Sequence, residues 1–109
     1  MKDLTAETCV PCEGGVPPLK PAKAKLLRKQ LHKDWHIAQD SKSLKRSMKF
    51  KDFYRTMNFV NAVAYIANTE DHHPDMEIGY GYCHITFATH SIGGLSENDF
   101  ICAAKVDRL

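Results

Sequence analysis

The segment Asn68-Thr69-Glu70-Asp71-His72-His73-Pro74 decides the fold, because one helix ends in it and a hairpin starts directly after it. Proline disfavours helical geometry at the residue before it. The helix that reaches this segment must therefore end near Thr69, and Asp71, His72 and His73 form a turn. Imidazole is the side chain that titrates closest to neutral pH. We therefore expect this turn to carry chemistry that depends on proton transfer.

The residues before the turn predict a long, well-buried helix from about Phe53 to Asn68. Asp52 is placed to cap its N-terminus. Apolar residues recur at three- and four-residue intervals, which is typical of a helix face packed on a core. They are Phe53, Met57, Phe59, Val60, Val63, Ala64, Ile66 and Ala67. A helix with so broad an apolar stripe should lie across a sheet.

The residues after the proline alternate between apolar and polar, which is the pattern of β-strands. One strand is predicted over 76–80 and a second over 83–90, with glycines between them. A hairpin of this kind returns the chain toward the turn from which it started. We therefore expect His90 to approach His72 and His73.

The rest of the chain completes one domain. A short helix is predicted over 21–32, and a first hairpin has strands over 35–39 and 44–50. Ser96-Glu97-Asn98-Asp99 has the pattern of a capping box and begins a final helix that extends to Val106. The prediction is an α+β fold in the order α-β-β-α-β-β-α, with a four-stranded antiparallel sheet and helices packed on one face.

Residues 1–21 are predicted to be a flexible tail that precedes a domain of residues 22–109. The tail contains Cys9-Val10-Pro11-Cys12, and a C-x-x-C pair can be redox-active or half of a zinc site. The redox interpretation needs a strand before the pair and a helix after it. The zinc interpretation needs two further ligands. Neither context is visible, so we favour two accessible reduced thiols whose role stays open.

The composition is that of an ordinary globular domain: 109 residues, 43% hydrophobic and 26% charged, with a net charge of +2. So small a charge argues against direct binding to nucleic acid. No apolar run is long enough to span a membrane, and the first residues lack the apolar core of a signal peptide. A cytoplasmic protein with reduced cysteines is expected.

The three histidines of the central region, His72, His73 and His90, allow more than one interpretation. A metal site would need two adjacent histidines to converge from an irregular turn, and the spacing of zinc proteases is absent. Structural or surface histidines are an alternative to acid–base catalysts. The sequence contains no phosphate-binding loop and no nucleophile elbow.

A combined motif resembles the signature of the pterin-4a-carbinolamine dehydratases. Its parts are Asp71-His72-His73-Pro74, Tyr80, His84-Ile85-Thr86, Thr89-His90, Gly94-Leu95-Ser96 and Asp99, with Trp35 and Phe50-Lys51-Asp52-Phe53 upstream. The resemblance covers about residues 24 to 108. One departure is Asn68, at a position that is often acidic in the family. It puts an auxiliary carboxylate contact in doubt, although Glu70 is nearby.

The resemblance implies dehydration of 4a-hydroxytetrahydropterin, a 4a-carbinolamine, to quinonoid dihydropterin and water. This lyase reaction recycles the tetrahydropterin cofactor of an aromatic amino-acid hydroxylase. His72, His73 and His90 are implied as acid–base catalysts, and neither a metal nor another cofactor is required. Substrate contacts are implied for Asp71, His72, His73, Pro74, Ala88, Thr89, His90 and Ser91.

The predicted final helix has more apolar surface than one face of a sheet can cover, and it contains the small residues Ala103 and Ala104. This predicts a homo-oligomer, a dimer or tetramer as in the resembling family, built through this helix, a sheet edge or both. Two alternative functions stay open. One is a non-catalytic interaction module for dimerisation or transcriptional coactivation. The other is a dehydratase-like protein of a different pterin pathway, such as molybdopterin metabolism.

Overall fold

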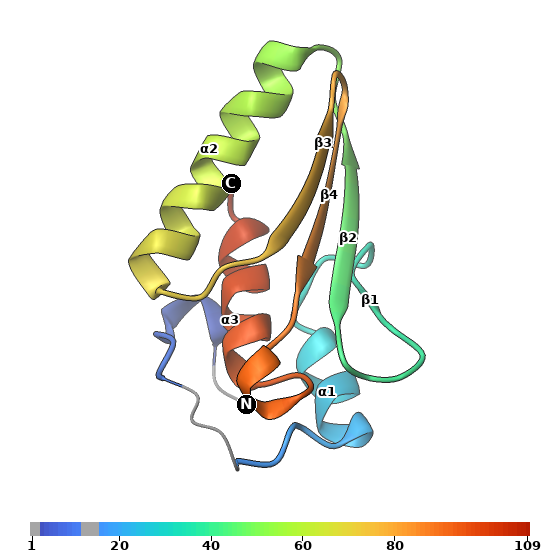
Figure 1. The fold of residues 1–109 in the computed structure, drawn as a ribbon, viewed down its shortest axis with the longest axis vertical. Coiled ribbons are helices and arrows are strands. Elements are labelled where there is room, and N and C mark those ends of the chain that lie inside the picture. Colours follow the sequence, from blue (N-terminus) through green and yellow to red (C-terminus); the bar gives the residue numbers. More distant parts are fainter. Residues whose placement is uncertain (1–2, 12–15) are drawn as a thin grey trace.

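The computed structural model describes residues 3–11 and 16–109. Three α-helices and four strands follow one another in the predicted order, and two short 3₁₀-helices accompany them (Figure 1). The elements are η1 (Leu4–Ala6), α1 (Pro21–Arg28), β1 (His36–Ile37), β2 (Leu44–Lys49), α2 (Phe53–Glu70), β3 (Asp75–Gly79), β4 (Tyr82–Phe87), η2 (His90–Ile92) and α3 (Glu97–Val106).

The strands form one antiparallel sheet in the order β1-β2-β4-β3. Phe87 of β4 pairs with Leu44 of β2, and Ile85 of β4 pairs with Met76 of β3. The helices α2 and α3 lie on the same face of this sheet (Figure 1), which confirms the predicted α+β architecture. The strand β4, which leads toward His90, is central in the sheet. The sheet edges are β1 and β3.

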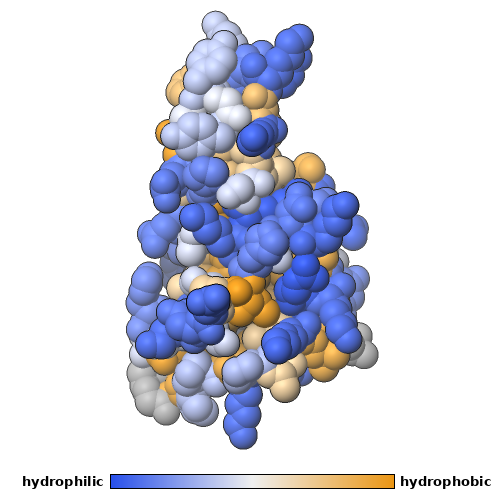
Figure 2. All heavy atoms as spheres, turned by 90° about the vertical axis from the view of Figure 1, so that its right-hand side faces the viewer, coloured by the Kyte–Doolittle hydropathy of each residue, from blue (hydrophilic) through white to orange (hydrophobic). Residues whose placement is uncertain are grey.

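The core lies between the sheet and these two helices. Trp35 and Phe87 are fully buried, with their ring centroids 6.1 Å apart, and Phe100 of α3 is equally buried. On the opposite face of the sheet, Lys45 and Lys49 are exposed, and Figure 2 shows that side of the molecule as mainly hydrophilic. No helix in the described ranges is long and apolar enough to cross a membrane.

Helix α2 begins and ends as its sequence predicts. Asp52 caps it by accepting a hydrogen bond from the N–H of Arg55 at 2.9 Å. The helix ends at Glu70, and Asp71 follows in the left-handed conformation with φ 51°. The N–H of His72 then donates to the carbonyl of Ala67 at 3.1 Å, which closes the helix end in the manner of a Schellman motif. The two histidines of the turn therefore start from a fixed backbone.

Helix α1 is shorter than predicted and ends at Arg28 instead of His32. The next backbone bonds connect residues three apart: Lys29 to Leu26, Gln30 to Leu27 and Leu31 to Arg28. This tighter winding is common at helix ends. Leu31 is nevertheless buried, as its apolar side chain requires.

The N-terminal segment, predicted to be a tail, lies against the domain in its described part. Leu4 of η1 is buried and its N–H donates to the side-chain oxygen of Gln30. Figure 1 shows this segment beside α3 and the C-terminal end of α2. The described residues therefore differ from a free tail, whereas Cys12 lies outside them.

Helix α3 does not present the apolar surface that its sequence suggested. Phe100, Ile101, Cys102, Ala103, Ala104 and Val106 are all at most 4% exposed. The sheet, α2 and the N-terminal segment cover the helix on different sides. The prediction of a subunit interface through this helix rested on exposed apolar side chains. That expectation of exposure is wrong, because other parts of the same chain bury these side chains.

Candidate active site

A cavity of about 440 Å³ lies where α2 ends, β4 leads into η2, and α3 begins. Its lining residues are Cys9, Val10, Pro11, Glu70, Asp71, His72, His73, Ala88, Thr89, His90, Ser91 and Asn98. The three histidines singled out by the sequence thus reach one cavity. Seven of the eight residues expected to contact substrate line this cavity. The eighth, Pro74, directly precedes β3.

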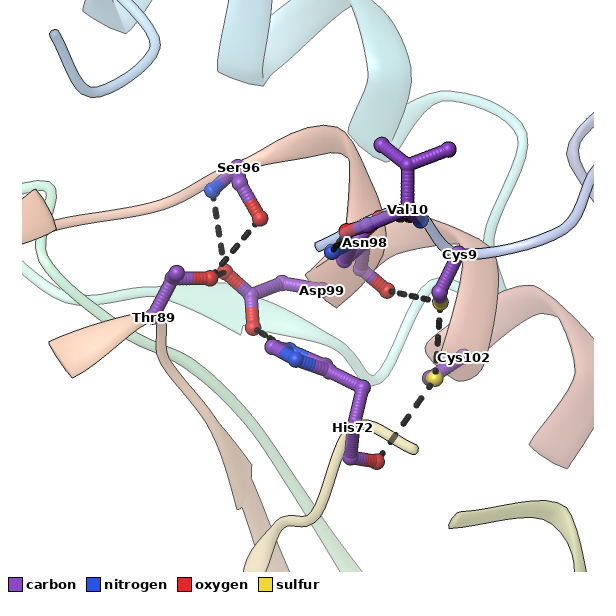
Figure 3. Close-up of polar contacts among 8 residues, drawn as sticks. All are labelled: Cys9, Val10, His72, Thr89, Ser96, Asn98, Asp99 and Cys102. Carbon is purple, nitrogen blue, oxygen red and sulfur yellow. Dashed lines mark hydrogen bonds and ion pairs between the residues drawn. The ribbon is translucent and has the colours of Figure 1, made fainter. Parts of the chain in front are cut away.

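His72 is held by a buried carboxylate. Its Nε2 lies 2.6 Å from Oδ1 of Asp99, which is fully buried at the start of α3 (Figure 3). The imidazole also lies parallel to the ring of Phe87, with centroids 6.0 Å apart. A carboxylate only accepts hydrogen bonds, so the proton of this pair sits on Nε2. The ring of His72 is therefore fixed in orientation and in tautomer.

The second oxygen of Asp99 is satisfied by its own helix end and by Thr89. Oδ2 accepts from the hydroxyl of Thr89 at 2.8 Å and from the N–H of Ser96 at 3.0 Å. The bond from Ser96 completes the capping box predicted from the sequence. The hydroxyl of Ser96 lies 2.7 Å from that of Thr89. One carboxylate therefore closes the N-terminus of α3 and positions His72.

His73 and His90 have different environments from His72. Nε2 of His73, an exposed residue, lies 3.0 Å from the amide oxygen of Asn68. Asn68 stands at the position where the resemblance leads one to expect an acid, and the contact to the neighbouring imidazole is made here by a neutral amide. His90 is exposed at the start of η2. His72 thus contacts a carboxylate, His73 contacts an amide, and His90 is exposed at the cavity.

Glu70 is a lining residue that sequence analysis noted only as nearby. Its carboxylate accepts from Nζ of Lys105 at 2.7 Å and from the N–H of Cys9 at 2.8 Å. The ammonium of Lys105 and the N–H of Cys9 hold the pKa of Glu70 below its usual value. The glutamate therefore stays charged at neutral pH and ties α2 to α3 beside the cavity.

The sequence analysis did not place four of the lining residues at the site. Cys9, Val10 and Pro11 reach the cavity from the N-terminal segment, and Asn98 reaches it from the first turn of α3. Asn98 pairs with the backbone of Val10: Val10 N–H donates to Oδ1 at 3.1 Å, and Nδ2 donates to the carbonyl at 2.6 Å. These partners are 88 residues apart in sequence, so no local pattern reveals them.

Among residues 3–11 and 16–109, no three side chains of histidine, cysteine, aspartate or glutamate converge in a way that could hold a metal ion. Two acidic residues at the site are in ion pairs: Asp99 with His72, and Glu70 with Lys105. The cavity thus presents three imidazoles, together with the carboxyl group of Asp71.

Sequence comparison connects this geometry to a known family. The family model described as pterin 4 alpha carbinolamine dehydratase matches residues 17–109. A protein of Nitrosomonas europaea is 58% identical over 107 residues, which is 98% of this chain and 93% of its own length. A protein of Legionella pneumophila is 51% identical and covers 98% of this chain and 95% of its own length. Both are named provisionally as pterin-4-alpha-carbinolamine dehydratases.

Two solved structures are similar in fold. One, from Brucella melitensis, is described as a transcriptional coactivator/pterin dehydratase; it is 31% identical with a TM-score of 0.78 and covers 84% of this chain and 96% of its own. The other is a pterin dehydratase-like protein described as a RuBisCO assembly factor in the alpha-carboxysome. At 24% identity, a TM-score of 0.61 and coverage of 71% and 89%, it supports the fold alone. The family match over residues 17–109, with identities above 50% to curated relatives, shows that this chain belongs to the pterin 4 alpha carbinolamine dehydratase family.

Proposed function

We propose that this protein removes water from 4a-hydroxytetrahydropterin to give quinonoid dihydropterin, and so recycles the cofactor of an aromatic amino-acid hydroxylase in the cytoplasm. The observation that carries the proposal is the meeting of His72, His73 and His90 at one cavity. Membership of the dehydratase family supports it.

The reaction suits a site made of imidazoles. The substrate carries a hydroxyl and a ring nitrogen on one carbon, and the nitrogen lone pair can expel the hydroxyl once that group is protonated. A second group must remove a proton from the ring system. Histidines in different environments can divide these two tasks at neutral pH. No electrons are transferred, so the chemistry requires no redox cofactor.

We assign the base role to His72. Because Nε2 carries the proton shared with Asp99, Nδ1 is the ring atom left to accept a proton. His72 would then hold the proton taken from the substrate while its Nε2 stays bonded to Asp99. His73 and His90, which have no carboxylate partner among the described residues, are then the candidates to protonate the leaving hydroxyl. Asp71, Ala88, Thr89 and Ser91 would hold the pterin ring.

The test generates the carbinolamine with a hydroxylase and follows its decay by absorbance. The protein should accelerate the decay, and replacing His72, His73 or His90 with Ala should each slow it. His84→Ala is a matched control, since His84 lies on β4 against Ser47 and outside the cavity. Decay at the spontaneous rate with the unaltered protein, or full activity in a variant that lacks all three imidazoles, would refute the proposal.

We also propose a homo-oligomer, now with the edge strand β3 as its interface. This strand pairs on one side only. Ile78 is 39% exposed, and Tyr80, in the turn after β3, is 70% exposed; the ring of Tyr80 stacks on Phe53, itself 47% exposed. Light scattering should give a dimer or tetramer, and Ile78→Lys should reduce the mass. A monomeric mass for the unaltered protein would exclude the interface.

The non-catalytic interaction module loses the feature on which it rested, because α3 is buried within the chain. Its remaining support is the description of the Brucella relative as a coactivator as well as a dehydratase. A partner-binding role should survive replacement of the three histidines, whereas the dehydratase role should not.

A further inference from the structure

A segment outside the family match forms one wall of the cavity. Cys9, Val10 and Pro11 face the same space as the three imidazoles, whereas the family model begins at residue 17. The Nitrosomonas relative aligns over 107 of the 109 residues, so its alignment includes this segment. The wall is therefore formed by residues that lie outside the family match but inside the alignment with the Nitrosomonas relative.

Hydrogen bonds on both sides of the segment fix its backbone. The N–H of Cys9 donates to Glu70, and the N–H and carbonyl of Val10 both bond to the side chain of Asn98. Figure 3 shows Cys9 and Val10 lying along the first turns of α3 as a result. With the backbone held in this way, the side chain of Cys9 points toward α3.

The thiol of Cys9 meets a second thiol there. Its Sγ lies 3.5 Å from Sγ of Cys102, which is fully buried on α3, whereas Cys9 is half-buried. Cys102 also lies 3.9 Å from the carbonyl oxygen of His72, and Cys9 lies 3.7 Å from that of Asn98. A disulfide bond is about 2.05 Å long, so the two sulfurs need to approach by roughly 1.5 Å to form one.

We propose that Cys9 and Cys102 are a reversible dithiol–disulfide pair that latches the segment Cys9–Pro11 onto α3 as a wall of the cavity. The oxidant is a small peroxide, which can reach the half-buried Cys9 through the cavity that this residue lines. Only the effect of the latch on substrate rests on the proposed function. The pair adds a covalent modification site to the fold, and it joins the chain's first and last parts.

The chemistry balances in two steps. The Cys9 thiolate attacks one peroxide oxygen and breaks the O–O bond, which gives a sulfenic acid and a hydroxide that becomes water with the proton lost by the Cys9 thiol. Cys102 then attacks that sulfur, the S–O bond breaks, and the hydroxyl leaves as a second water with the thiol proton. Two electrons pass from the two sulfurs to the peroxide. A thiol such as dithiothreitol reverses the bond by exchange.

The environments of the two thiols set this order. The hydrogen bond with Cys9 and burial raise the pKa of the Cys102 thiol, and the carboxylates of Glu70 and Asp99 act in the same direction. Cys102 is thus the poorer first nucleophile. Once Cys9 is a sulfenic acid, Cys102 is the resolving thiol, because its Sγ lies 3.5 Å from Sγ of Cys9.

The experiment treats the full-length protein with hydrogen peroxide, alkylates the remaining thiols and maps disulfides by peptide mass. The expected product is a link between Cys9 and Cys102 that dithiothreitol removes. The link should persist in Cys83→Ser, because Cys83 is buried on β4 away from the pair, and in Cys12→Ser. It should be lost in Cys9→Ser and Cys102→Ser.

Two further measurements on the same samples separate the latch from the enzyme. Amide exchange at Val10 should slow on oxidation, since the segment is then held covalently. The KM for the carbinolamine should change on oxidation and return with dithiothreitol. Oxidation of Cys9 beyond the sulfenic state without a link, or a Cys9–Cys12 link as the main product, would overturn the pair. An unchanged KM in linked protein would overturn its action on the cavity. Absence of all turnover would count against the proposed function alone, because the link is scored by mass.

Discussion

The carboxylate of Asp99 lies 2.6 Å from Nε2 of His72 with no exposure to solvent. Replacing Asp99 with Asn keeps the shape of the side chain and removes the charged group that His72 contacts. A hydrogen bond to a charged group contributes about 1.5–3 kcal/mol, which corresponds to roughly a tenfold to hundredfold effect on rate. We expect kcat to fall by that factor while the protein stays folded, as measured by the carbinolamine decay assay and circular dichroism.

The matched control for this change is Glu77→Gln, which removes a carboxylate from an exposed position on β3. It should leave kcat unchanged. If Asp99→Asn retained full activity in a folded protein, the base assignment for His72 would lose its support.

Asn68 offers a test of the amide contact to His73. The amide oxygen of Asn68 lies 3.0 Å from Nε2 of His73, and replacing Asn68 with Asp puts a negative charge at that position. The carboxylate stabilises the protonated imidazole, so the limb of the pH–rate profile that belongs to His73 should move to higher pH. Rates measured from pH 5 to 9 would show the shift. A matching profile for the two proteins would mean that His73 does not take part in the proton transfers.

The pair of Glu70 and Lys105 predicts a specific acid sensitivity. The pKa of Glu70 is lower in the folded protein than in the unfolded chain. The ion pair therefore contributes its full stabilisation of the folded protein at pH values above the unfolded pKa, which is about 4.3. This stabilisation is lost as the pH falls through the folded pKa. Urea unfolding at pH 7 should show Glu70→Gln to be less stable by about 2 kcal/mol.

The difference between Glu70→Gln and the unaltered protein should shrink as the pH is lowered toward 3. Glu77→Gln, at an exposed position, should show no such pH-dependent difference. If the difference in unfolding free energy between Glu70→Gln and the unaltered protein were the same at every pH, the ion-pair interpretation would be contradicted.

The burial of α3 predicts the outcome of Ala104→Arg. Ala104 is 3% exposed, so the guanidinium would have to be buried or the helix displaced. An unpaired buried charge costs several kcal/mol, about 3 or more. We expect loss of cooperative folding in urea and not a change in subunit number. Ala22→Arg on the exposed side of α1 should be neutral. A folded Ala104→Arg protein of reduced mass would instead support an interface through α3.

The predictions from sequence were correct where the determining interactions are local. Three such features are the end of α2 before Pro74, the N-cap of α2 by Asp52, and the capping box formed by Ser96 and Asp99. Each depends on residues within a few positions of one another. The four-stranded sheet followed from alternation, because β2 and β4 each alternate buried and less buried side chains. These patterns act within one element, and the sequence displays them directly.

The errors came from contacts between distant parts of the chain. The apolar face of α3 looked unsatisfied only because the sequence did not show that the segment around Leu4 covers part of it. The same reason hid Val10 and Asn98 from the candidate site. The convergence of His72 and His90 was foreseen, since a hairpin connects them, but the partner of each imidazole was not.

The contacts of the N-terminal segment also determine when the site can be completed during synthesis. Cys9 meets Glu70 across 61 residues and Cys102 across 93. Closing loops of that length is entropically costly until the intervening chain has folded. The ribosome makes this segment before it makes its partners on α2 and α3. The nascent chain therefore cannot complete the cavity wall until Asn98 and Cys102 of α3 have emerged from the ribosome.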